Sequence, residues 1–426
     1  MAVRELFATT RVLAAQGPRQ VYWGASALAS DLRNTFRHGS AGFRRWVRRD
    51  FLSYFSGGSA PIKGETEQRA HAAAGWLLRA QKEGGDGGAS YGYFPGVGQP
   101  WGWKPSYPET TGYIISALID YGRRFPERAD PAAVLRMAQW EARVQMANGA
   151  VQGGQVCPPE RQTAAAFNTG MVLDGWCSVI EKLGDRSIFD AAKRAADWLA
   201  DDVDERGYFR TNGAFVSKDA IKTYTCLCAW ALYRFGEISG TQRYRDVAIR
   251  VIESAIAKQE ANGWFRDNCL TRPDAPLTHT IGYALQGILE VGVLAGRKDF
   301  IEAAQRSVAQ LMRIPEADGY LAGRLDRNWK PANMSSCLTG SAQIAIVAFR
   351  LFQLTGNQDY ARFGHLLVNY LKPLQALECE DASIIGALPG SFPIFGGYMR
   401  GGYPNWATKY FLDALLLQLA CQDAGA

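Results

Sequence analysis

The sequence lacks the features that mark membrane-spanning and disulfide-bonded proteins. No apolar run reaches about 18 residues, the length needed for a membrane-spanning helix. The N-terminus has no apolar segment followed by a small-residue cleavage site, so we expect no secretory signal. The eight cysteines include no CxxC pair, which favours reduced thiols over a disulfide framework. These absences predict a cytoplasmic protein.

Motifs for metals, nucleotides and serine hydrolases are also missing. Cys226 and Cys228 are two residues apart in a helical segment, where their thiols diverge by about 200°. No second Cys/His cluster has ligand spacing, so we expect core cysteines rather than a metal site. The sequence has no phosphate loop, no GxSxG and no dinucleotide fingerprint. It therefore predicts neither a metal nor a cofactor.

Excess positive charge is lacking outside the N-terminal 60 residues. Residues 1–60 hold nine Arg, no Lys and three acids, which accounts for the whole net charge of +6. The remaining chain is close to neutral, which argues against a nucleic-acid partner. Aromatic residues make up 12% of the sequence, with 12 Trp. An aromatic-rich neutral body fits either a flat-faced ligand such as a sugar or a large core.

Two interleaved glycine series reveal an internal repeat. One series follows apolar helical segments at Gly122, Gly184, Gly236, Gly296 and Gly356. The other ends Asn-Gly, Arg-Gly or Asp-Gly turns at Gly149, Gly207, Gly263 and Gly319. Glycine just past a helix accepts the left-handed conformation that closes it. Each series has a period near 57 residues, which predicts one helical hairpin per repeat.

The two helix types differ in polarity. One alternates apolar and charged residues at helical spacing, as half-exposed helices do, whereas the other has few charges and many small residues. We expect the charged helices outside and the small-residue helices inside a closed all-α (α/α)6 toroid of six hairpins. The expected outer helices are 65–82, 131–147, 188–203, 242–260, 298–314 and 358–376. The expected inner helices are 108–121, 163–183, 219–235, 278–295, 335–355 and 405–421.

This pattern predicts one toroid domain over residues 61–426, preceded by a basic arm over residues 1–60. Long loops rich in Gly and aromatics precede the inner helices. Long ordered loops on one face of a scaffold usually carry function. Inner-helix N-termini also point backbone N–H groups toward that face. We therefore place the candidate site at a funnel mouth on the loop side.

The sharpest motif runs from Trp101 to Tyr113 and contains Trp103, Tyr107 and Glu109. Pro108 suits the first turn of a helix, and the helix N-terminus favours the charged form of Glu109. Glu109 is a candidate general acid or base, with Trp101 and Trp103 as sugar platforms. The alternative is that Glu109 only complements the helix dipole.

The last repeat echoes this motif with Tyr403, Asn405, Trp406 and Lys409. Asn405 stands where Glu109 stood, and Lys409 follows one turn later. Closure of the ring would bring the two Tyr-Pro motifs together at the seam. The alternative is that they serve only hairpin packing.

Other ionisable candidates lie at the starts of inner helices and in their loops. Asp219 and Lys222 are three residues apart, either as a surface ion pair or as funnel groups next to Tyr224. His279 is suited to proton transfer or to a structural role. Four arginines are candidates to clamp a uronic acid carboxylate, or are plain surface residues: Arg272, Arg324, Arg327 and Arg400.

The arm segment 36–55 is basic and amphipathic. It could contact an anionic membrane surface or a synthase complex, which would make the protein peripheral to the inner membrane. Alternatively, Phe43, Trp46 and Phe51 pack on the ring while the arginines stay solvated.

The motifs starting at Tyr107 and Tyr403, with residues 388–395, resemble those of proteins encoded in bacterial exopolysaccharide gene clusters of the Vibrio type. The resemblance covers most of residues 64–420 and implies a role in making or modifying a polysaccharide. Some members carry a delta-aminolevulinate dehydratase label. That enzyme needs a βα barrel, and this sequence shows no alternating strand pattern.

Three functions remain open from the sequence. The first is a carbohydrate-active hydrolase, lyase or C5-epimerase with a saccharide partner. Its catalytic candidates are Tyr107, Glu109, Lys222, Tyr224, His279 and Lys409. Its substrate-binding candidates are Trp101, Trp103, Arg272, Arg327, Arg400, Tyr403, Asn405 and Trp406. The second is a toroid of the terpene-cyclase or prenyltransferase type, which the spacing of Gln145–Gly149 and Gln259–Gly263 faintly resembles. The third is a non-catalytic glycan-binding or scaffold protein.

Overall fold

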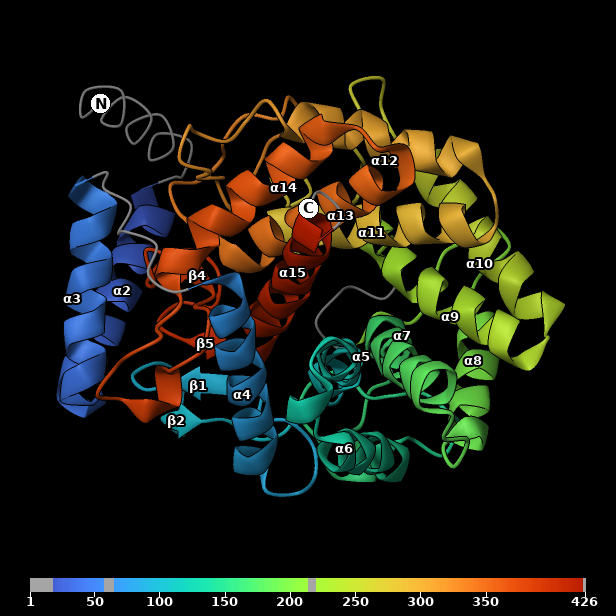
Figure 1. The fold of residues 1–426 in the computed structure, drawn as a ribbon, viewed down its shortest axis with the longest axis horizontal. Helices are drawn as coiled ribbons and strands as arrows, with labels where there is room; N and C mark the ends of the chain where they lie inside the picture. Colours follow the sequence, from blue (N-terminus) through green and yellow to red (C-terminus); the bar gives the residue numbers. More distant parts are fainter. Residues whose placement is uncertain (1–17, 57–64, 214–219, 424–426) are drawn as a thin grey trace.

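Two concentric layers of helices surround a common axis (Figure 1). The computed structural model describes residues 18–56, 65–213 and 220–423. Within them the outer helices are α4 (Thr66–Gly84), α6 (Pro131–Val144), α8 (Phe189–Asp202), α10 (Gln242–Ile256), α12 (Lys298–Leu311) and α14 (Gln358–Leu371). The inner helices are α5 (Pro108–Arg124), α7 (Ala166–Ser178), α9 (Cys226–Ser239), α11 (Thr278–Leu294), α13 (Leu338–Thr355) and α15 (Asn405–Asp423). The predicted (α/α)6 toroid is confirmed.

The inner helices close the ring. Each one packs against the next, and α15 returns to pack against α5. Short connections join each inner helix to the outer helix that follows it, whereas the long loops run from outer to inner helices. The hairpin unit therefore runs from inner to outer. The last inner helix, α15, has no following helix and packs on α4 instead.

Small residues allow the inner helices to lie very close together. A Cβ atom on Gly175 would come within 2.2 Å of the Gly112 carbonyl oxygen, and one on Gly287 within 2.3 Å of the Cys226 backbone. Such distances leave no room for a side chain. Cys226 and Cys228 are buried here, which confirms them as core cysteines.

The first glycine series combines two physical roles. Gly184, Gly296 and Gly356 have φ near +70° and end their helical segments, as predicted. Gly122 and Gly236 lie inside α5 and α9, which continue to Arg124 and Ser239, so the prediction that they end helices is wrong. A Cβ on Gly122 would lie 2.9 Å from Ala129 Cβ. Close packing, and not backbone conformation, therefore requires a glycine at position 122.

The second series joins neighbouring outer helices. Gly149, Gly207, Gly263 and Gly319 all have positive φ, and a Cβ on any of them would strike the backbone of the next outer helix. Glutamine side chains add hydrogen bonds to this contact between a turn and the next outer helix. The Gln145 amide donates to the Gly149 and Ala191 carbonyls at 2.9 and 3.0 Å. Gln259 and Gln375 make the equivalent pairs of bonds at their own turns.

The third inner helix starts later than expected. The 214–219 segment, with Asp219, lies outside the described residues. A short 3-10 turn, η4 (Thr223–Thr225), comes first and α9 begins at Cys226. The Thr223 hydroxyl donates to the Arg266 carbonyl at 2.6 Å, which fixes this turn to the neighbouring loop. A π-helical segment, η3 (Val179–Leu183), extends the second inner helix, α7.

Short strands bring the ends of the ring together. β1 (Gly92–Phe94) pairs antiparallel with β2 (Gly102–Trp103) and with β5 (Tyr403–Pro404), so Tyr93 lies opposite Tyr403. The Asn405 amide donates to Thr110 Oγ1 at 2.8 Å. The predicted meeting of the two Tyr-Pro motifs at the seam is confirmed. A second pair joins β3 (Ser336–Cys337) to β4 (Ser391–Phe392).

Two arm helices, α2 (Pro18–His38) and α3 (Ala41–Ser56), lie at one flank of the ring (Figure 1). Phe43 and Val47 of α3 are buried in the main core, and the Asp50 carboxylate accepts a 2.6 Å hydrogen bond from the Ile394 amide. The inner face of α3 thus packs on the ring. The domain boundary near residue 60 stays a prediction. None of the described helices is both long and apolar enough to cross a membrane.

Candidate active site

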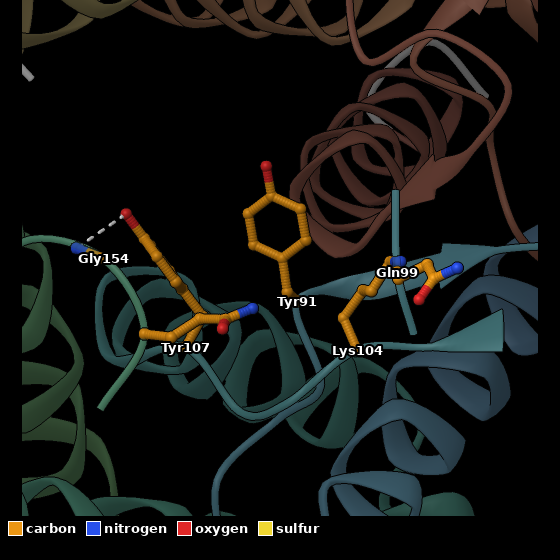
Figure 2. Close-up of a pocket in the computed structure, with 6 residues that line it drawn as sticks. Tyr91, Gln99, Lys104, Tyr107 and Gly154 are labelled. Carbon is orange, nitrogen blue, oxygen red and sulfur yellow. Dashed lines mark hydrogen bonds between the residues drawn. The ribbon is translucent and has the colours of Figure 1, made fainter. Parts of the chain in front are cut away.

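A cleft opens where the loops before α5 and α7 meet. Its volume is about 430 Å³, and it is lined by Tyr91, Gln99, Lys104, Tyr107, Gly154 and Gln155. Figure 2 shows Tyr107 turned toward Gly154, whose amide donates to its hydroxyl at 3.3 Å. Lys104 is not available for a ligand, since its ammonium donates to the carbonyls of Val97, Gly98 and Pro100. The cleft is large enough for a sugar.

Glu109 lies in the first turn of α5, beside this cleft. Its side chain is half-buried, and its Oε2 lies 3.4 Å from the Tyr107 hydroxyl, which donates to it. Burial raises the pKa of Glu109 to about 7, although the Tyr107 hydrogen bond opposes the shift. In the described part of the chain Glu109 takes part in no ion pair. A carboxyl near neutrality that is not paired with a cation can both donate and accept a proton.

Eight aromatic side chains form what we call the aromatic belt around the funnel. Tyr91 lies 5.3 Å from Tyr107 and 4.8 Å from Trp406, measured between ring centroids. The Trp406 indole donates to the Tyr398 hydroxyl at 2.8 Å. The belt continues through further ring contacts at 4.3–5.4 Å, and its remaining members are His279, Tyr283, Phe167 and Tyr224. Loops and helices from both ends of the ring therefore supply one continuous wall.

Glu109 acts electrostatically on several members of the belt. Burial raises the pKa values of Tyr91, Tyr107, Tyr224 and Tyr398, and the charge of Glu109 raises each of them further. These hydroxyls therefore stay protonated near neutral pH and can donate hydrogen bonds. The Tyr107 hydroxyl is in direct contact with the Glu109 carboxyl.

His279 and Lys409 are held by neighbours within the protein. The Nδ1 of His279 lies 2.9 Å from Gln343 Oε1, and burial lowers the pKa of His279 to about 4. The imidazole is thus neutral, with Nδ1–H donating to Gln343. Lys409 is buried and pairs with Asp413 at 2.8 Å, with its ammonium 4.0 Å from the Tyr410 ring centroid. This pair lies beneath the belt, against Tyr113 and Tyr410.

Several predicted binding residues lie outside the belt. Trp101 stacks on His38 of α2 with 3.7 Å between ring centroids, and Trp103 contacts Trp76 and Tyr93. Tyr403 is buried against Phe43 of the arm. The side-chain amide of Asn405 donates to the Ser90 carbonyl and to Thr110 Oγ1, so Asn405 has a structural role at the seam.

The predicted cations have partners of their own. Arg327 pairs with Glu260 at 2.8 Å and Arg400 with Asp31 at 2.7 Å. Lys222 donates to the Leu270 carbonyl at 3.0 Å, and Arg272 pairs with Asp274 at 3.0 Å. Arg324 donates to the Ala275 carbonyl at 2.7 Å. Burial raises the pKa of the Cys269 thiol, and the charges of Lys222 and Arg324 oppose this shift.

Sequence reasoning missed four residues of the belt, Tyr91, Phe167, Tyr283 and Tyr398, and two tyrosines beneath it, Tyr113 and Tyr410. Two of these six follow a recognisable pattern. Tyr113 and Tyr283 each follow a glycine in the second turn of an inner helix, four residues after Glu109 and His279. Alignment of the repeats on these glycines would have pointed to a shared inward position.

Two other features are structural. Asp202 and Asp204, at the end of outer helix α8, accept hydrogen bonds from backbone amides of residues 206–211. Both carboxylates therefore hold the turn that follows α8. Among the described residues no group of His, Cys, Asp or Glu could hold a metal ion.

Known structures share this architecture. A heparin-specific unsaturated glucuronyl hydrolase is 15% identical, with a TM-score of 0.67 over 84% of this chain and 98% of that one. The unsaturated glucuronyl hydrolase of Bacillus sp. GL1 is 17% identical, with a TM-score of 0.62 over 83% and 96% of the two chains. A mutant of the Streptococcus agalactiae enzyme complexed with dGlcA-GalNAc6S is 13% identical, with a TM-score of 0.59 over 84% and 96%.

At these identities the likeness establishes the fold alone. No family model and no curated protein matches the chain. The resemblance to exopolysaccharide-cluster proteins, including a role in biosynthesis, therefore stays a prediction. The delta-aminolevulinate dehydratase label does not fit, because the chain folds as a helical toroid and not as a βα barrel.

Proposed function

We propose that this protein is a carbohydrate-active enzyme that removes an unsaturated uronyl residue from the end of a glycan. The observation that carries the proposal is Glu109, a half-buried carboxyl of pKa about 7 that accepts a hydrogen bond from Tyr107 of the aromatic belt. The similar solved structures are described as unsaturated glucuronyl hydrolases, and one of them is complexed with dGlcA-GalNAc6S.

The chemistry needs one acid–base group. A double bond next to the ring oxygen of a sugar is an enol ether. Hydrolysis adds a proton to one carbon of this bond and the hydroxyl of water to the other, which gives a hemiketal. The hemiketal opens by breaking its bond to the ring oxygen and leaves a hemiacetal at C1, which collapses to an aldehyde and releases the rest of the glycan as an alcohol. Glu109 can donate the first proton and then, as a carboxylate, take a proton from the water.

In the described part of the chain, no second acid contributes to the pKa of Glu109. Retaining and inverting enzymes place two carboxyl groups about 5–9.5 Å apart. Among the described residues, desolvation and the Tyr107 hydrogen bond account for the pKa of Glu109, with no contribution from another acid. A reaction that needs a single carboxyl fits this arrangement better than an ordinary glycosidase mechanism does.

Belt residues supply binding and orientation in this proposal. Tyr91 and Trp406 offer ring faces to the sugar, whereas the hydroxyls of Tyr107 and Tyr398 are hydrogen-bond donors. Lys222, two residues before Tyr224, is the cation that we assign to the uronate carboxylate, for which it would exchange its hydrogen bond to the Leu270 carbonyl. Neutral His279 can accept a hydrogen bond through Nε2.

A second candidate, elimination or C5-epimerisation of a uronate, is favoured by the tyrosines. Both reactions need a base to remove a proton next to the carboxylate and an acid to donate one. Glu109 would be the base, and the tyrosines, whose raised pKa values keep them protonated, would be the acids.

The test compares the wild-type protein with Glu109→Gln on unsaturated uronyl disaccharides and on intact uronate polysaccharides. We expect the wild type to remove the ultraviolet absorbance of the conjugated double bond. The Gln variant should be about 10²–10⁴-fold slower, because it keeps the shape but loses proton transfer. Glu205→Gln, at an exposed site on a distant loop, is the matched control and should retain full activity.

Other outcomes separate the alternatives. New absorbance formed from an intact polysaccharide would indicate a lyase, and uptake of deuterium from heavy water without cleavage would indicate an epimerase. Saccharide binding that is equal in the wild type and the Gln variant, with no turnover of any substrate, would favour a glycan-binding scaffold.

A further inference from the structure

The outer face of α3 combines positive charge with exposed apolar side chains. Leu52 is 72% and Phe55 76% exposed, the highest values among the large hydrophobic side chains that the structure describes as exposed. Arg45, Arg48 and Arg49 are exposed one to two turns earlier on the same helix. Their spacing of three or four residues places them on one helical face.

The acids of the arm do not neutralise this face. Asp50 is buried on the opposite side of α3, where it accepts the Ile394 amide. Asp31 is mostly buried and pairs with Arg400. Glu380, from the ring, pairs with Arg45, but both side chains are largely exposed, so the pair is screened by water.

Neighbouring positions extend the same pattern. On α2, Arg33 and Arg37 are exposed, and Phe36 is 41% exposed between them. Arg45, Arg48 and Arg49 also line a hollow of about 530 Å³ with Leu52, Ser53 and Ser56. This hollow is wide enough to seat an anionic headgroup.

We propose that the outer face of α3, with Arg33, Phe36 and Arg37 of α2, docks on a membrane surface that contains anionic lipids. Helices that lie in the plane of a membrane carry arginines at the phosphates and bury Leu and Phe at the edge of the acyl layer. A nucleic acid would satisfy the arginines but offers no apolar layer to Leu52. The contact is peripheral, because no described helix can span a bilayer.

The membrane contact does not depend on which reaction the protein catalyses. It would place the candidate active site close to the membrane surface. The inner face of α3 holds the loop that carries Tyr398 of the belt, through Asp50 and Ile394. Docking through the outer face would leave that contact in place, so a membrane-bound molecule would keep the loop in position.

The experiment is flotation of the full chain with vesicles of phosphatidylcholine alone or mixed with phosphatidylglycerol, at low and high salt. We expect binding to the anionic vesicles, loss of binding at high salt, and little binding to neutral vesicles. Absence of binding to anionic vesicles, or equal binding to both types, would overturn the proposal.

Variants locate the surface. Arg48→Glu with Arg49→Glu should lower the vesicle affinity at least about ten-fold, whereas Arg48→Lys with Arg49→Lys should change it by less than about three-fold. Leu52→Ser with Phe55→Ser should also weaken binding about ten-fold, because the apolar contact is lost. These residues are exposed, so a thermal melt should confirm that each variant stays folded.

The matched control is Arg136→Glu with Arg313→Glu, two exposed arginines on α6 and just after α12 that make the same change in net charge. It should bind within about three-fold of the wild type. A similar loss in the control would mean that net charge, and not the α3 face, drives binding. A protein partner that requires Leu52 and Phe55 while vesicles fail to bind would replace the membrane as the occupant.

Discussion

Glu109 and Lys409 each lie within the first two turns of an inner helix, yet their surroundings give them different properties. Glu109 is half-buried beside a cleft, and its nearest polar neighbour is a tyrosine hydroxyl. Lys409 is buried, and Asp413, one turn later, neutralises it. A carboxyl without a cationic partner keeps a pKa near neutrality, whereas the paired ammonium stays charged. Both residues were catalytic candidates from the sequence, because a sequence does not show which partners a side chain meets across the fold.

The raised pKa of Glu109 predicts how stability depends on pH. An unfolded Glu titrates near 4.5, whereas the folded pKa is about 7, so the folded state binds more protons between these values. Stability should therefore fall as pH rises from about 4.5 to about 7. Glu109→Gln removes this dependence, and at pH 8 the variant should be more stable than the wild type by up to about 3 kcal/mol.

Urea unfolding of both proteins at pH 5 and pH 8 measures this difference. Asp50, whose pKa burial also raises to about 7, contributes to the pH dependence of both proteins and cancels in the comparison. If wild type and Glu109→Gln differ in unfolding free energy by the same amount at pH 5 and at pH 8, Glu109 is solvated and its pKa is not raised.

Lys409 can be tested by removing one or both partners of its ion pair. Lys409→Met leaves the Asp413 carboxylate buried and unpaired and should cost about 3–5 kcal/mol in unfolding free energy. Lys409→Met with Asp413→Leu should recover most of this loss, as measured by thermal or urea unfolding. The folded double variant should keep activity within about ten-fold of wild type. A complete loss of activity in that variant would restore Lys409 as a catalytic residue.

The candidate site was predicted only in part, and the reason is local. Tyr107, Glu109, Tyr224, His279 and Trp406 were recognised because they start inner helices after Gly-rich loops. Tyr283 and Tyr410 look like core residues in sequence, since they lie within apolar helices. Trp101 and Trp103 looked like sugar platforms, but their contacts are with the arm and α4, and spacing along the chain cannot show that.

At the level of elements, the glycine turns do more than end helices. Gly263 has φ +81°, and a Cβ there would lie 2.9 Å from the Arg306 carbonyl oxygen of α12. The turn after one outer helix is therefore seated on the backbone of the next. This explains why the Asn-Gly, Arg-Gly and Asp-Gly series marks the turns between neighbouring outer helices, although the helices themselves end five to eight residues before these glycines. The other series includes glycines inside helices.

Two glycines with similar backbone angles allow the cost of backbone strain to be distinguished from the cost of a steric clash. Gly296 has φ +64° with open space around its Cβ position, so Gly296→Ala should cost only about 1 kcal/mol. Gly263→Ala carries the same backbone strain and also strikes α12, and should cost about 2–4 kcal/mol. Urea unfolding of the two variants measures the difference. Equal losses would show that the turn can move away from α12.

For the whole molecule, the arm and the ring are more closely joined than the charge pattern suggested. Residues 1–60 stand apart in sequence because they hold the excess arginines. Yet Phe43 and Val47 lie in the same core as the ring helices, and Tyr54 donates to the Met334 carbonyl at 2.6 Å. Composition identified the solvated face of the arm but not its buried face.

We therefore expect the ring to lose stability without residues 1–50. Phe43→Ala should cost about 3–5 kcal/mol, because it removes a fully buried ring, whereas Phe36→Ala, at an exposed position of α2, should cost less than about 0.5 kcal/mol. Thermal melts of these variants and of the truncated chain test this expectation. A truncated chain that melts like the full protein would support an arm that is independent of the ring.

The architecture was predictable because it repeats. Six similar hairpins give six chances to detect the same pattern, and an error at one helix start, such as the third inner helix, does not change the count. The direction of the hairpins was not recognised, because sequence order alone does not show whether an outer helix packs on the inner helix before it or after it.

The pairing of α15 with α4 joins the two ends of the ring without a peptide bond. Thr66 at the start of α4 and Gln418 near the end of α15 come within 3.4 Å through their side chains. The ring is therefore closed by packing between helices, and not by the order in which the hairpins occur along the chain. A chain that begins at α10, with a flexible linker from the end of α15 to the start of α2, should fold into the same toroid, so this protein is a natural candidate for circular permutation.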